Sequence, residues 1–90
     1  MTSAEENLLI QRMTAQEPAA LAAFYDHFGL DLYRVIFAIV PRPALAEAIL
    51  QESLIHLWFS LSHYDAACDR LFPWAVHLCR ARALRQRPLG

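Results

Sequence analysis

The sequence contains no lysine, only two glycines and only two cysteines, and its apolar runs are short. The run from Val35 to Val40 is far below the roughly 20 residues that a membrane-spanning helix requires. The first residues, MTSAEEN, lack the basic and apolar regions of a signal peptide. Cys68 and Cys79 are too few for a disulfide framework, and we interpret them as small buried apolar side chains. We therefore expect a soluble cytoplasmic protein without membrane contact.

The composition is that of a folded chain. Hydrophobic residues make up 57% of the 90 residues and aromatic residues 11%, so the chain is not disordered. A single domain of this length buries only about 60% of the surface of its unfolded chain. The chain therefore packs very efficiently, or a partner covers part of its apolar surface.

Acidic residues are absent after position 69. Residues 1–69 carry three arginines against nine acidic residues, a net charge of −6, whereas residues 70–90 carry five arginines and a net charge of +5. This asymmetry indicates either a polyanion or an acidic partner at the C-terminal end, or a helix whose cations suit the negative end of its dipole. Composition alone does not separate the two.

The spacing of apolar residues predicts an all-α fold. Ser3 and Glu6 form a capping-box pattern that begins a helix over about 4–15, and proline in the first turn begins another at Pro18. Gly29 ends or bends that helix, and a further helix follows directly and stops before Pro41. Helices over about 44–61 and 70–87, separated by a loop over 62–69, complete the prediction.

These segments predict a compact bundle of four to five helices. The domain covers residues 5–87, and residues 88–90 are interpreted as a tail or a truncated linker.

The helix over 44–61 carries two apolar stripes. At about 100° per residue, one stripe is the expected core face, formed by Leu50, Leu54, Leu57, Trp58 and Leu61. The far side holds Ala48, Ile55 and Phe59, with Ile49 and Glu52 near them. Either other helices pack on both sides, or the second stripe binds a partner, with Gln51 and Glu52 as polar anchors for an arginine-bearing surface.

Two stretches, PALAEAILQESLIHLW and HYDAACDRLFPWAVHLCRARALR, resemble region 2 of bacterial extracytoplasmic-function (ECF) sigma factors. The matching positions are Ala46, Glu47, Gln51, Glu52 and Trp58, then Tyr64, Asp65, Trp74 and Arg80. Upstream, AALAAFYDHFGLDLYRVIFAIV is similar to the first helical pair of that family. The resemblance covers about residues 5–87 and implies a domain of transcription initiation that uses no cofactor.

The resemblance also implies two partners. The helix over 44–61 would dock on the coiled coil of the RNA polymerase β′ subunit through Glu47, Ile49, Gln51, Glu52 and Ile55. The loop and last helix would contact single-stranded promoter DNA at the −10 element through His63, Tyr64, Asp65, Arg70, Arg80, Arg82, Arg85 and Arg87. An anti-sigma factor would cover the same surfaces. Trp74 is expected to pack in the core beside Leu71 and Leu78.

The chain departs from the family pattern in places. Ala81 and Arg85 replace the asparagine and aspartate that are common on the DNA-facing helix, and Ala48 stands where an acid is usual. An ECF sigma factor normally continues into a second helical domain that reads the −35 element. An alternative is therefore a sigma-like regulator, or a decoy for an anti-sigma factor, that acts by protein–protein contact alone. A third is an unrelated helical oligomer.

Catalytic and metal-binding patterns are weak. His56 and His63 are seven residues apart, and His77 and Cys79 lie two apart and so face different directions on a helix. The sequence shows no phosphate loop or nucleophile elbow, and Glu47 and Glu52 point apart. We expect neither a metal site nor an enzyme.

Overall fold

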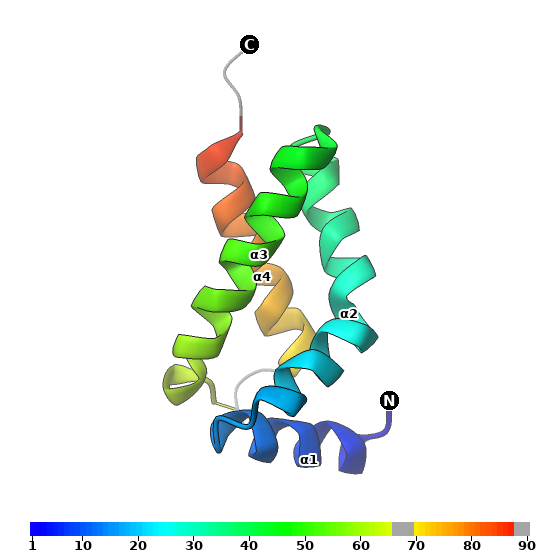
Figure 1. Ribbon diagram of the computed structural model, residues 1–90, viewed down its shortest axis with the longest axis vertical. Coiled ribbons are helices and arrows are strands. Elements are labelled where there is room, and N and C mark those ends of the chain that lie inside the picture. Colours follow the sequence, from blue (N-terminus) through cyan, green and yellow to red (C-terminus); the bar gives the residue numbers. More distant parts are fainter. Residues whose placement is uncertain (66–69, 88–90) are drawn as a thin grey trace.

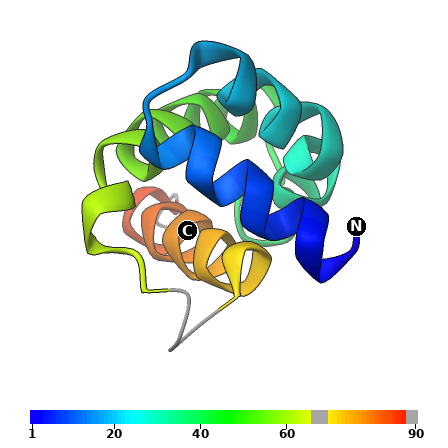
Figure 2. The same cartoon turned by 90° about the horizontal axis from the view of Figure 1, so that it is seen from below.

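The computed structural model describes residues 1–65 and 70–87 as a helical bundle. Its elements are α1 (Ser3–Thr14), α2 (Pro18–Ile39), α3 (Pro43–Phe59), the 3₁₀ turn η1 (Leu61–His63) and α4 (Leu71–Gln86). Helices α2 and α4 run in the same direction and α3 runs opposite to both, while α1 lies across one end (Figures 1 and 2). The described residues contain no strand, so the predicted all-α bundle is confirmed.

The helix starts follow local chemistry. Pro18 lies in the first turn of α2, as predicted, and Pro43 lies in the first turn of α3, one residue before the helix start expected at about 44. The cap of α1 lies one residue earlier than predicted, because Thr2 and not Ser3 accepts a hydrogen bond, at 3.2 Å, from the backbone N–H of Glu5. Glu6 was expected to form the capping box with Ser3. Its side chain is instead buried and pairs with Arg70 at 3.3 Å.

Helix α2 is continuous through Gly29, so the separate helix expected after this glycine is wrong. Glycine costs a helix only about 1 kcal/mol relative to alanine. That cost is offset because Phe24, Phe28, Leu32 and Ile36, four residues apart on both sides of Gly29, are all buried. A Cβ at Gly29 would lie 3.1 Å from the Tyr25 ring, so the missing side chain makes room for that ring.

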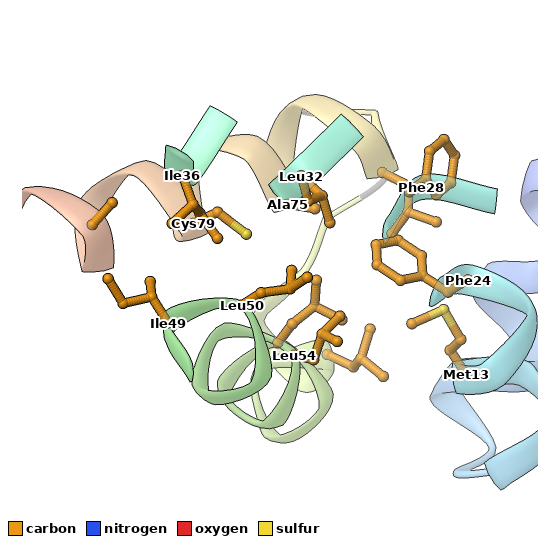
Figure 3. Close-up of a cluster of buried hydrophobic side chains, with 14 of the residues drawn as sticks. Met13, Phe24, Phe28, Leu32, Ile36, Ile49, Leu50, Leu54, Ala75 and Cys79 are labelled. Carbon is orange, nitrogen blue, oxygen red and sulfur yellow. The ribbon is translucent and has the colours of Figure 1, made fainter. Parts of the chain in front are cut away.

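The core lies where α2, α3 and α4 meet, and Met13 of α1 closes one end (Figure 3). Helix α4 buries a line of residues spaced four apart: Leu71, Ala75, Cys79 and Ala83. Three of these four side chains are small, which lets α4 pack closely against the larger side chains of α2 and α3. Trp74 and Leu78 are half-buried and pack against this core, as expected. Cys79 is a buried free thiol, as predicted, whereas Cys68 lies outside the described residues.

Burial raises the pKa of the Cys79 thiol from 9.0 to about 11, although a hydrogen bond with Ser53 offsets part of the effect. The folded chain therefore keeps a proton that the unfolded chain loses between pH 9 and 11, so stability falls as pH rises through this range. Between pH 8 and pH 10, the free energy of unfolding measured with urea should fall by about 1 kcal/mol more in the wild type than in Cys79→Ala. Equal losses in the two proteins would contradict this.

Candidate docking and nucleic-acid surfaces

The second stripe of α3 is exposed. Ile55 is 59% and Phe59 75% exposed, and Glu47, Gln51 and Glu52 also face outward. Helices α2 and α4 both pack against α3, but within the described residues neither covers this stripe, so packing on both sides of the helix does not explain it. Large exposed apolar side chains beside polar anchors are typical of a protein interaction surface.

Ile49 does not belong to this surface. It is completely buried with Ile36 and Cys79 near it (Figure 3), so it cannot touch a docking partner, and its assignment to the polymerase-binding set is corrected. The reason is that α3 packs against both α2 and α4, which widens its buried arc. Ser53, one turn later, is buried on the same arc and donates a hydrogen bond to the Ile49 carbonyl at 2.7 Å.

The exposed face of α3 continues into two hollows against α2. The smaller hollow, about 350 Å³, is lined by Pro18, Leu21, Ala22, Tyr25, Gln51, Leu54 and Ile55. The larger, about 670 Å³, is lined by Tyr25, Asp26, Gly29, Leu30, Tyr33, Pro43, Ala44, Glu47 and Leu50. Tyr25 borders both, and the acidic residues Asp26 and Glu47 help to line the larger one. An apolar groove with carboxylates suits a partner that presents apolar and cationic side chains.

Glu52 connects the α3 face to α4. One of its carboxylate oxygens, Oε2, accepts a hydrogen bond from Gln86 at 2.8 Å and lies 3.4 Å from a terminal nitrogen of Arg82. The Arg82 side chain is half-buried, and the described residues offer no hydrogen-bond partner to its buried Nε. This contact joins a predicted docking residue to a predicted DNA-binding residue.

The remaining predicted DNA-binding residues of α4 lie towards its two ends. Arg80, Arg85 and Arg87 are exposed in its C-terminal half. Arg70, the N-cap residue at the other end, lies about 15 Å from Arg80 and about 26 Å from Arg87 along the helix axis, and it pairs with Glu6. The structure therefore does not gather these cations into one patch.

The predicted loop begins with a short 3₁₀ turn. His63 and Asp65 are exposed, but Tyr64 is half-buried and packs on Trp74, with ring centroids 4.8 Å apart. Sequence reasoning missed this packing, because the contact depends on how the turn folds back against α4. Residues 66–69 of the predicted loop lie outside the described residues.

The described segments also bear on metal ions and membranes. No group of three or more His, Cys, Asp or Glu side chains within residues 1–65 and 70–87 could hold a metal ion. Over the same ranges, no helix has both the length and the apolar character needed to cross a bilayer.

Comparison with known proteins shows what the chain resembles. It is 26% identical over 82 residues, or 91% of its length, to the ECF RNA polymerase sigma factor SigK of Mycobacterium bovis. The SigK proteins of Mycolicibacterium vanbaalenii and Mycobacterium ulcerans are 25% and 27% identical over 93% and 87% of the chain. The chain contains an ECF sigma factor-like domain. It spans only 42–44% of the length of these relatives.

The ECF sigma factor-like domain matches no family model and no solved structure in these comparisons. The resemblance therefore rests on the curated relatives and on the helical bundle, which agrees with the all-α fold expected for such a domain.

Proposed function

We propose that this ECF sigma factor-like domain acts in transcription initiation by docking on the β′ coiled coil of RNA polymerase and contacting single-stranded −10 promoter DNA. The observation that supports docking is the exposed face of α3, where Ile55 and Phe59 lie beside Glu47, Gln51 and Glu52. A soluble domain gains nothing from two large exposed apolar side chains on one helix face unless a partner covers them. The sequence of this helix also resembles the polymerase-binding helix of that family at Glu47, Gln51 and Glu52.

The test is a calorimetric titration of the domain with a β′ coiled-coil fragment. Ile55→Asp should weaken binding by roughly 30-fold or more, because an aspartate would be desolvated in an apolar contact. Leu8→Asp on α1 is the matched control, since Leu8 is 57% exposed but lies on another element. It should bind like the wild type. Failure of the folded wild type to bind would reject docking on polymerase.

A second candidate is supported by the Glu52–Arg82 contact, which occupies one of the predicted DNA-binding cations. In that case the domain is a sigma-like regulator, or a decoy for an anti-sigma factor, that acts without promoter contact. Docking without any salt-sensitive binding to a −10-like single strand would favour it. Self-association in sedimentation that Ile55→Asp abolishes would instead favour a helical oligomer.

A further inference from the structure

The contact between Glu52 and α4 lies at the border of the two proposed surfaces. Glu52 is on the exposed side of α3, and its side chain is still 51% exposed while it pairs with Arg82. Gln86 donates to the same oxygen, so Glu52 Oε2 accepts both α4 side chains. The contact also borders a hollow of about 270 Å³ that Ile55 and Phe59 help to line. A side chain that enters this hollow from a docked partner reaches the Glu52 carboxylate.

The ion pair between Glu52 and Arg82 is weak enough for an arginine of a partner to replace Arg82. A partly exposed ion pair stabilises a protein only weakly, whereas a bidentate guanidinium–carboxylate contact in a desolvated interface is stronger and more directional. The 3.4 Å separation of Arg82 from Glu52 is longer than a strong charge-assisted hydrogen bond. An arginine from a partner therefore has a carboxylate for which it can compete.

We infer that Glu52 is a shared acceptor that couples docking on α3 to the state of α4. In the free domain, Arg82 and Gln86 hold the carboxylate. A guanidinium of the docked partner takes their place, and Arg82 is released toward solvent, where its donors can reach a phosphate. The inference rests on the proposed function, because it needs a cationic partner on α3 and a polyanion on α4.

If α4 side chains compete with the partner for Glu52, a substitution on α4 should change the affinity of docking on α3. Removing the α4 competitor should strengthen binding of the β′ coiled-coil fragment, although the altered residue lies on the other helix. Arg82→Met, which keeps an unbranched apolar stem, and Gln86→Leu should each raise the fragment affinity about three- to ten-fold. Arg34→Met is the matched control: it removes the same charge from an exposed position of α2, outside both proposed surfaces, and should leave the affinity unchanged.

Thermodynamic linkage between fragment binding and DNA binding gives a second measurement. If docking releases Arg82, the fragment should raise the wild-type affinity for a −10-like single strand several-fold, and the strand should raise the fragment affinity by the same factor. That factor should fall to one in Arg82→Met, whatever the remaining DNA affinity of the variant. In Arg34→Met the factor should stay at its wild-type value, because the Glu52 contact is intact.

The outcomes separate the inference from the proposed function. If the wild type does not bind the fragment, the proposed function fails and the inference fails with it. If the wild type binds but Arg82→Met and Gln86→Leu bind equally well or more weakly, docking stands and competition for Glu52 is wrong. Circular dichroism of each variant identifies any loss of folding, and Gln86→Leu decides the matter if Arg82→Met does not fold.

Discussion

Replacing Ile49 with aspartate is expected to unfold the domain, although the sequence pattern placed this residue beside the docking stripe. Ile49 has no exposed surface in the folded chain. The substitution removes a core aliphatic side chain, which costs about 2–5 kcal/mol, and introduces an unpaired buried carboxylate, which costs several more. The sum is comparable with the roughly 5–15 kcal/mol that stabilises a typical domain. Thermal unfolding followed by circular dichroism should show no cooperative transition.

The neighbouring Ile55→Asp provides the matched comparison, because it makes the same chemical change six residues later on the same helix. Ile55 is 59% exposed, so the variant should fold, with a melting temperature within a few degrees of the wild type. A folded Ile49→Asp protein, or an Ile55→Asp protein that unfolds with it, would show that the buried arc of α3 is wrongly placed.

The features that the sequence predicted well are those that local chemistry determines. Pro18 begins α2, and the periodic stripe of Leu50, Leu54 and Leu57 forms the core face of α3. The continuity of α2 through Gly29 was missed, because a helical wheel carries no information on how well the flanking residues pack. Packing of Phe28 and Leu32 on the rest of the bundle overrides the low helix propensity of one glycine.

The candidate site was predictable as a helix face but not as a set of contacts. Ile49 lies at the edge of the wheel, and only the placement of two neighbouring helices on α3 decides that it is buried. The pairing of Glu52 with Arg82 joins residues 30 positions apart, and Tyr64 reaches Trp74 only through the turn between two helices. Such contacts follow from tertiary packing and leave no signal in local spacing.

Charge reversal at Arg80 and Arg85 is expected to reduce the affinity for single-stranded DNA by about 10- to 100-fold at low salt. Both side chains are exposed on α4. When an arginine neutralises a phosphate of a single strand, about 0.7 bound counterion is released, and a variant that loses the contact loses this release. The dependence of log affinity on log salt concentration should therefore flatten by about 1.4 for the double variant Arg80→Glu, Arg85→Glu. Fluorescence anisotropy with a −10-like strand, measured with the coiled-coil fragment present, gives both quantities.

The double variant Arg12→Glu, Arg34→Glu carries the same net charge but places the reversals on α1 and α2. It should bind the strand nearly as well as the wild type, because neither position belongs to α4. Equal decreases in affinity for the two double variants would mean that overall charge, and not the C-terminal half of α4, attracts the strand. In that case α4 carries no defined DNA surface, and the domain would act through the exposed face of α3 alone.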